Sequence, residues 1–253
     1  MKFMISPSKV ARALFLITLS LVCANITGQY ALYTFGKKYL HQCHLLSLIN
    51  QFDLGRGGNI PDWYESATLL LCALLLAAIA FLKQRRGESF LIRWWTLALL
   101  FLGLSVDEAT EAHQALVHLL QTALDATGLN NFAWEIPIAV CALVLALMYA
   151  RFLAALPRRT CVLFLVAGVI YVSGLLGLEM VGGWYLEENG QSNFTLALIS
   201  TAEEFMEMLG VVIFVYSLTA YLSLHVKDVR LSIGEEAPRP AVALQPVGAQ
   251  QLP

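Results

Sequence analysis

The sequence has few charged residues. Only 13% of its 253 residues are charged, against about 25% in an average soluble domain. As many as 58% are apolar and the mean hydropathy is +0.67, so apolar side chains must also form much of the surface. The formal net charge of −2 provides no basic surface for a nucleic acid. The composition therefore excludes a soluble globular enzyme, a disordered regulator and a nucleic-acid-binding protein.

Several motifs that carry catalysis or cofactor binding are also missing. The chain has no Gly-x-x-x-x-Gly-Lys-Ser/Thr phosphate loop, no Gly-x-Ser-x-Gly elbow and no His-Glu-x-x-His. No lysine lies in the late apolar stretches, which disfavours a retinal-type Schiff base. Of the five cysteines only Cys43 falls in a predicted outer loop, so no disulfide framework is indicated.

Long apolar runs dominate what is present. A helix needs about 20 apolar residues to cross about 30 Å of hydrocarbon, and backbone groups in lipid must pair within each segment. The sequence therefore predicts an all-α polytopic membrane bundle, residues 1–233, followed by a disordered cytoplasmic tail at 234–253 that is rich in Pro, Ala and Gln. Six transmembrane helices are expected, at residues 10–33, 63–82, 90–106, 132–155, 161–182 and 194–224.

Positive charge is distributed unevenly between the predicted loops. With the N-terminus placed inside, only Lys37, Lys38 and Arg56 lie on the outer side, and the other 13 of the 16 Lys and Arg residues lie on the inner side. Lys and Arg are concentrated in cytoplasmic loops of membrane proteins. Both termini are therefore predicted to be cytoplasmic.

Acidic residues have the opposite distribution. Fourteen of the 18 lie on or toward the outer side, and the orientation rule does not explain this, because acidic residues contribute little to it. Glu203, Glu204 and Glu207 even lie within the last apolar stretch. A charge at the bilayer centre costs about 2.5–3.5 kcal/mol on insertion scales. We therefore expect these three carboxylates to face the interior of the bundle.

A second acidic group ends the third apolar stretch. Asp107 and Glu108 are followed by His113, and no Gly or Pro interrupts residues 104–127. The helix is therefore expected to continue into an extra amphipathic outer segment after the third span. One stripe of such a helix would contain Asp107, Glu111, Gln114 and His118, which favours His118 over His113 as a partner of Asp107.

Carboxylates from the other spans are expected at the same level. Glu179 lies near the outer end of the fifth span, whereas Glu65 and Glu135 begin the second and fourth. Acidic residues at helix ends are more often exposed to solvent, or cap the helix, than they act as ligands. We expect this of Glu65 and Glu135. Like charges that lie close together require a cation or protons. The two interpretations are a bound metal ion and protonated acids in a proton or ion path.

A resemblance rests on three segments. Asn-Ile-Pro-Asp-Trp-Tyr at 59–64, Leu-Ser-Val-Asp-Glu at 104–108 with His113, and Ala-Glu-Glu-Phe-Met-Glu-Met-Leu-Gly at 202–210 together resemble a family of uncharacterised bacterial multi-spanning inner-membrane proteins. The resemblance implies a multi-pass protein of the bacterial inner (cytoplasmic) membrane. It favours His113 over His118 as the partner of Asp107 and Glu108, and it implies no activity.

These observations predict an outward-facing site that binds a divalent metal ion, with Zn, Fe or Mn favoured. Our first hypothesis is a metal-dependent membrane hydrolase or oxidoreductase that acts on a lipid or another amphiphile. The alternatives are a cation or proton-coupled transporter or channel, and a non-catalytic membrane subunit whose acids dock a partner. The predicted metal ligands are Asp107, Glu108, His113, Glu179, Glu203, Glu204 and Glu207.

Overall fold

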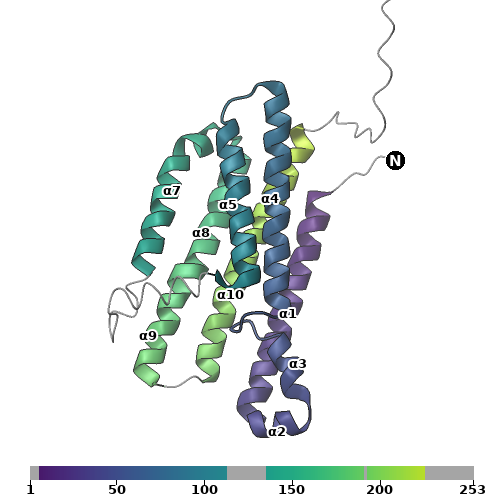
Figure 1. The fold of residues 1–253 in the computed structure, drawn as a ribbon, viewed down its shortest axis with the longest axis vertical. Helices are drawn as coiled ribbons and strands as arrows, with labels where there is room; N and C mark the ends of the chain where they lie inside the picture. Colours follow the sequence, from purple (N-terminus) through teal and green to yellow (C-terminus); the bar gives the residue numbers. More distant parts are fainter. Residues whose placement is uncertain (1–5, 113–134, 191–192, 226–253) are drawn as a thin grey trace, which may run out of the picture.

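The computed structural model describes residues 6–112, 135–190 and 193–225, and all the regular secondary structure within these ranges is helical. Most of the helices run side by side as an elongated bundle (Figure 1). The predicted all-α class is therefore confirmed for the described part of the chain. In chain order the elements are α1 (Pro7–Phe35), α2 (Lys37–Gln42), α3 (Leu45–Gln51), α4 (Ile60–Arg86), α5 (Leu91–Thr110), α7 (Glu135–Ala155), α8 (Arg158–Val172), the π-helix η2 (Ser173–Leu178), α9 (Glu179–Asn189) and α10 (Phe194–His225).

Five helical segments are long and apolar enough to cross a membrane. They are α1, α4, α7, the continuous run Arg158–Asn189 and α10, and each contains or closely overlaps one of the predicted stretches. The remaining predicted span coincides with α5, which carries Arg93, Asp107 and Glu108 within its 20 residues. The charges of α5 keep it out of this group, so its crossing of the membrane remains a prediction.

The end of α5 departs from the expected continuous helix. The helix stops at Thr110, and Glu111 adopts a left-handed backbone conformation with φ of 53°. The reason is a tertiary contact, because the Glu111 carboxylate lies directly over the backbone of Gly57. The stripe from Asp107 to His118 is therefore broken at Glu111. The predicted amphipathic segment itself falls mostly on residues 113–134, outside the described residues.

The centre of the bundle is α10, which contacts α1, α4, α8, η2 and α9. Phe214 of α10 stacks on Phe101 of α5, with ring centroids 4.7 Å apart, and meets Phe164 of α8 at 4.6 Å. Trp94 of α5 packs against Tyr221 of α10, with centroids 5.3 Å apart. These contacts form one apolar core that fills the half of the bundle in which α10 ends.

Two glycines bring α10 unusually close to its neighbour. A Cβ atom added to Gly210 would lie 2.9 Å from the Ala167 carbonyl oxygen and 2.9 Å from the Tyr171 Cβ, and one added to Gly174 would lie 2.9 Å from the Glu203 carbonyl oxygen. Small residues allow such backbone approach between membrane helices. Gly174 belongs to η2, where the chain changes from α-helical to π-helical winding.

Helix α1 is joined to the bundle by buried polar side chains. Asn25 donates to the Thr201 hydroxyl of α10 at 2.7 Å and accepts from the Leu54 backbone N–H at 3.3 Å. Gln29 donates to the Asp53 carboxylate at 2.7 Å. Hydrogen bonds of this kind hold helices together where apolar surface provides no preference between lipid and protein. They also anchor the loop at residues 52–59 above α4.

The bundle has one strongly basic end. The α4–α5 and α7–α8 turns and the end of α10 lie together there (Figure 1), and these turns carry Lys83, Arg85, Arg86, Arg158 and Arg159. We refer to this region as the basic end. The opposite end is formed by α2, α3 and the α9–α10 connection (Figure 1). That the basic end faces the cytoplasm remains a prediction.

The glycine contact between α8 and α10 has a testable consequence. Gly210→Ala should lower the stability of the detergent-solubilised protein by about 1–3 kcal/mol, because the new methyl group meets backbone atoms that cannot move aside. Thermal unfolding measures this effect. Gly168→Ala is the matched control, because Gly168 of α8 has open space around it and alanine favours the helix by up to about 1 kcal/mol. Equal stabilities for the two variants would refute the close contact.

Candidate functional site

The start of α4 is held by its own loop. The Asn59 side chain accepts from the Asp62 backbone N–H at 3.5 Å and donates to the Asp53 and Arg56 carbonyl oxygens at 2.5 Å each. The Asp62 carboxylate accepts from the Gly58 backbone N–H. This N-cap satisfies donors that the first helical turn leaves free. It fixes the rotation of α4 and so the direction in which Glu65 points.

Glu65 lies on the buried face of α4. Only 6% of the residue is exposed, and within the described structure its Oε1 atom has no hydrogen-bond partner. Glu204, Glu108, Glu207 and Asp62 are the charges that act on it most strongly. A buried carboxylate oxygen without a partner costs folding free energy, of the order of 1–3 kcal/mol or more for a charged group. Glu65 is therefore the residue that most clearly requires a ligand or a proton.

Helix α10 brings two further carboxylates to the same place. Glu207 is 9% exposed, and Tyr171 of α8 lies close to its carboxylate. Glu204, one turn earlier, interacts with Glu207, Glu203 and Glu108. We call Glu65, Glu108, Glu204 and Glu207 the carboxylate cluster. Asp62, Glu203 and Glu179 flank it.

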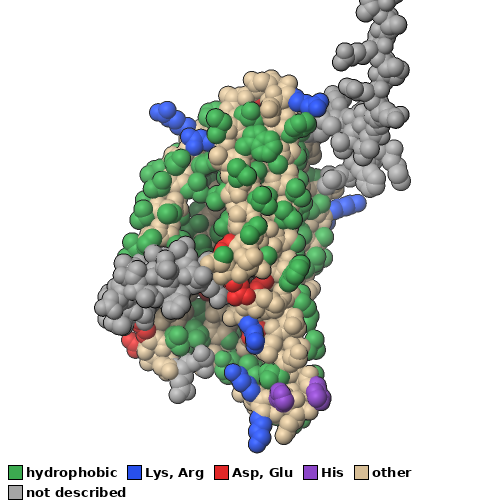
Figure 2. Space-filling model, viewed as in Figure 1, with side chains coloured by type: hydrophobic (Ala, Val, Ile, Leu, Met, Phe, Trp, Pro, Cys, Tyr) green, Lys and Arg blue, Asp and Glu red, His purple; other side chains and the backbone are tan. Residues whose placement is uncertain are grey.

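The electrostatics of the cluster are one-sided. The strongest charge interactions of Glu65, Glu204 and Glu207 are all with other carboxylates. Acidic side chains also gather on the visible face of the molecule near the lower end of α5 (Figure 2). Repulsion between like charges in a medium of low dielectric constant is much stronger than in water. The three carboxylates therefore repel one another strongly where they lie.

The cluster lies far from the basic end. Glu65 and Lys83 are 18 residues apart on α4, which is about 27 Å along a helix that rises about 1.5 Å per residue. This distance is close to the thickness of the hydrocarbon core, about 30 Å. Between the two levels lie buried apolar side chains that include Leu69, Leu76 and Val215. With Lys83 at one membrane boundary, the cluster would lie near the other.

The structure brings most of the predicted site residues together. Glu108, Glu203, Glu204, Glu207 and Glu179 all belong to or flank the cluster. Asp107 is partly exposed on α5, and because it precedes Glu108 by one residue, its side chain leaves the helix about 100° away. His113 and the alternative His118 lie outside the described residues.

The sequence analysis placed Glu65 at the level of the site but left it out of the predicted ligands, and the expectation that it would be solvated or capping is wrong, because it is 6% exposed. Its position contained a signal, because Thr68, Leu69 and Cys72 follow it at helical spacings of three, four and seven and are also buried. Tyr171 was missed as well. A tyrosine in an apolar span gives no local sign that its hydroxyl meets a carboxylate on another helix.

The predicted metal site is not preformed. Among residues 6–112, 135–190 and 193–225, no three His, Cys, Asp or Glu side chains are arranged to hold a metal ion. The oxygen atoms are close enough to repel one another, but they do not converge on one point. A metal ion would require the flexible Glu side chains to change rotamer.

Comparison with known proteins identifies one family. The model of a domain of unknown function, DUF8692, matches residues 13–222. No curated protein and no solved structure matches the chain. The match spans α1 to α10 and includes every residue of the carboxylate cluster.

The burial of Glu65 predicts a stabilising substitution. Glu65→Gln should raise the midpoint of thermal unfolding in chelator-treated protein, by the equivalent of about 1–3 kcal/mol, because glutamine is neutral by itself, whereas Glu65 must either take up a proton or stay charged among like charges. The control is Glu188→Gln, which makes the same change at the exposed end of α9 and should have no effect. A lower midpoint for Glu65→Gln would mean that the carboxylate already has a compensating partner.

Proposed function

The chain belongs to the DUF8692 family, and from the geometry of its site we propose that it is an integral membrane protein that binds a cation at the carboxylate cluster. The observation that carries this proposal is Glu65, a buried carboxylate that has one unpartnered oxygen and whose strongest charge interactions are with three other glutamates. Protons occupy the cluster when the cation is absent, because four adjacent carboxylates cannot all remain ionised.

The ligand chemistry favours a hard divalent ion. The described cluster offers only carboxylate oxygens and the Tyr171 hydroxyl, and ligand sets of this type suit Mg²⁺, Ca²⁺ and Mn²⁺. Addition of the imidazole of His113 would extend the set toward Zn or Fe. Mn²⁺ binds both to sites made of oxygen ligands and to sites that include a histidine, and it is therefore the most informative probe. Glu65, Glu204 and Glu207 would hold it, with Glu108 as the fourth carboxylate.

The burial of the carboxylates and the core next to them favour a cation-binding site over a transporter or a surface that docks a partner protein. A transporter would need a polar route beyond the cluster, whereas the described core toward the basic end is mostly apolar, with Ser217 and Thr219 of α10 as isolated buried polar side chains. A surface that docks a partner protein would present its charges outward, but Glu65 and Glu207 are buried between helices. If the protein is an enzyme, its substrate would be a lipid or another amphiphile. The bound ion would then activate water near the bilayer boundary.

Mn²⁺ binding tests the proposal. Chelator-treated protein in detergent is titrated with Mn²⁺, and the free ion is followed by its electron paramagnetic resonance signal. We expect saturation at about one ion per chain. Glu204→Gln and Glu207→Gln should weaken binding by about tenfold or more, equivalent to about 1.4 kcal/mol, because each removes a charged oxygen ligand.

Two variants make the result specific. Glu188→Gln should bind as the unmodified protein does, because Glu188 lies at the exposed end of α9. Glu65→Gln should fold at least as stably as the unmodified protein and yet bind weakly, which separates loss of the site from loss of the fold. If the protein retains no Mn²⁺, or if Glu204→Gln and Glu207→Gln bind as tightly as Glu188→Gln, the proposal is wrong.

A further inference from the structure

The loop between α3 and α4 contains an exposed segment between two buried residues. Leu54 is 3% exposed and Asn59 is 4% exposed. The side chain of Leu54 packs with Leu21 of α1 and Met208 of α10, and Asn59 caps α4. The four residues between these two anchors are all exposed, and we call them the strap: Gly55, Arg56, Gly57 and Gly58.

The strap meets three helices that carry the carboxylate cluster. A Cβ atom added to Gly55 would lie 3.8 Å from the Ser200 Cβ of α10. The Gly58 backbone N–H donates to the Asp62 carboxylate of α4. Gly57 lies against the carboxylate of Glu111, the residue that ends α5.

Each of these contacts lies about one helical turn beyond a carboxylate of the cluster, on the side away from the basic end. The pairs are Ser200 and Glu204 on α10, Asp62 and Glu65 on α4, and Glu111 and Glu108 on α5. The strap therefore crosses the end of the cluster that faces away from the basic end.

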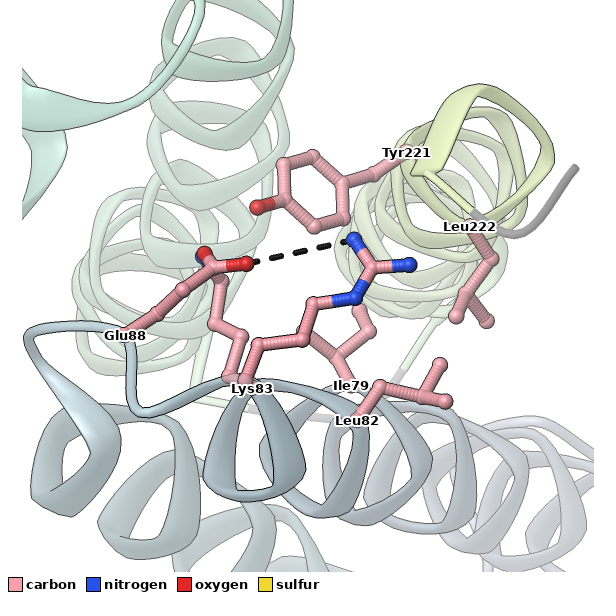
Figure 3. A pocket seen from close by; sticks show the side chains of 7 residues that line it. Ile79, Leu82, Lys83, Glu88, Tyr221 and Leu222 are labelled. Atoms are coloured by element: carbon pink, nitrogen blue, oxygen red, sulfur yellow. Dashed lines mark hydrogen bonds and ion pairs between the residues drawn. The ribbon is translucent and has the colours of Figure 1, made fainter. Parts of the chain in front are cut away.

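In the described part of the bundle, no continuous polar route leads from the basic end to the cluster. At the basic end Glu88 pairs with Lys83 and Arg86, beside Tyr221 and between the last turns of α4 and α10 (Figure 3). Behind these side chains the mostly apolar core begins, with Leu76 fully buried in it. Apolar side chains cannot replace the water around an ion. A cation would therefore approach the cluster from the end that the strap crosses.

The contact between Gly57 and Glu111 holds the strap against α5. The Glu111 carboxyl group occupies the space that a Cβ atom on Gly57 would need. Glu111 also has a left-handed backbone conformation, with φ of 53°. A residue with a side chain keeps such a conformation only where its surroundings hold it, and such positions are frequent at clamps and switches. The end of α5 and the strap therefore fix each other.

We propose that the strap is a gate over the carboxylate cluster and that the Glu111 carboxylate is the latch that keeps it closed. The strap opens by moving between its anchors at Leu54 and Asn59, which stay buried. Loops that cover binding sites commonly move in this way, with a few backbone positions taking up the change. The role of the gate in cation entry rests on the proposed function, whereas its control of access to Glu65 does not.

Chemical labelling of Glu65 tests the gate. The detergent-solubilised protein is treated with a water-soluble carbodiimide and a small amine, and the rate at which Glu65 is modified is followed by peptide mass spectrometry. Gly57→Ala should raise this rate about fivefold or more, because its methyl group displaces the Glu111 carboxylate. Glu188, at the exposed end of α9, should react at the same rate in every variant.

Gly55→Ala is the matched control. It adds the same methyl group to the same strap, but the nearest atoms lie 3.7 and 3.8 Å away, at ordinary contact distance. Neither Gly55 nor Gly57 has a positive φ, so alanine suits the backbone at both positions. The rate at Glu65 should be unchanged in Gly55→Ala. An unchanged rate in Gly57→Ala, or an equal increase in both variants, would overturn the proposal.

A double variant tests the latch itself. Glu111→Ala should also speed the labelling of Glu65, and Gly57→Ala should add nothing in that background, because the carboxylate that it displaces is gone. Cys72, which is fully buried in the core, should stay unreactive toward a water-soluble thiol reagent in all variants. Additive effects would refute the latch. Reaction of Cys72 in Gly57→Ala would show general loosening of the bundle and would also refute it.

Mn²⁺ exchange connects the gate to the proposed cation site. Release of Mn²⁺ into excess chelator should be about fivefold or more faster in Gly57→Ala than in Gly55→Ala, because a latch that opens more often lowers the barrier to exit. Equal release rates would refute the role of the gate in cation entry. A protein that binds no Mn²⁺ would refute the proposed function, and the labelling rates of Glu65 would still decide whether the strap is a gate.

Discussion

Repulsion among Glu65, Glu204 and Glu207 is opposed by helix packing that holds the backbones of these residues close together. The backbone of α10 touches α8 at Gly210 and Gly174, and the Asn59 cap fixes the start of α4. Like charges in a membrane bundle would separate if the helices could rotate or slide, because the repulsion grows as water is excluded. Here the helices cannot do so without breaking these contacts. The proposed cation would compensate this negative charge where it lies.

The π-helix η2 lies where this constraint is strongest. It occupies Ser173–Leu178, two residues after Tyr171, which lies close to Glu207, and directly before Glu179. A π-helical turn inserts an extra residue and is frequent at functional sites. In this bundle it changes the rotation of the helix between Tyr171 and Glu179, so that both residues act on Glu207 although they are eight positions apart. The close contact at Gly174 needs a residue without a side chain at this turn.

The two ends of the bundle carry opposite chemistry. The carboxylate cluster is negative and enclosed by helices, whereas the turns at the basic end carry Lys83, Arg85, Arg86, Arg158 and Arg159. About 27 Å of mostly apolar core separates the two levels along α4. This arrangement suits a protein that spans one bilayer, with the carboxylates near one boundary and the basic turns at the other.

Local properties of the chain were enough to predict the helical class, five segments able to span a membrane and the inward direction of the acids on α10. Length and hydropathy depend only on neighbouring residues, and a charge within an apolar helix costs too much to face lipid. The match to the DUF8692 family agrees with the resemblance to a family without an assigned activity.

Tertiary structure decided which carboxylates meet. Glu65 enters the cluster because its cap sets the rotation of α4, Glu108 enters because α5 turns that face inward, and α5 ends at Thr110 because Glu111 packs on Gly57. Each of these outcomes depends on how one helix is rotated against another. A local pattern such as the spacing that follows Glu65 can indicate which face of a helix is buried, but the side chains that this face meets are set by contacts between residues that are distant in the chain.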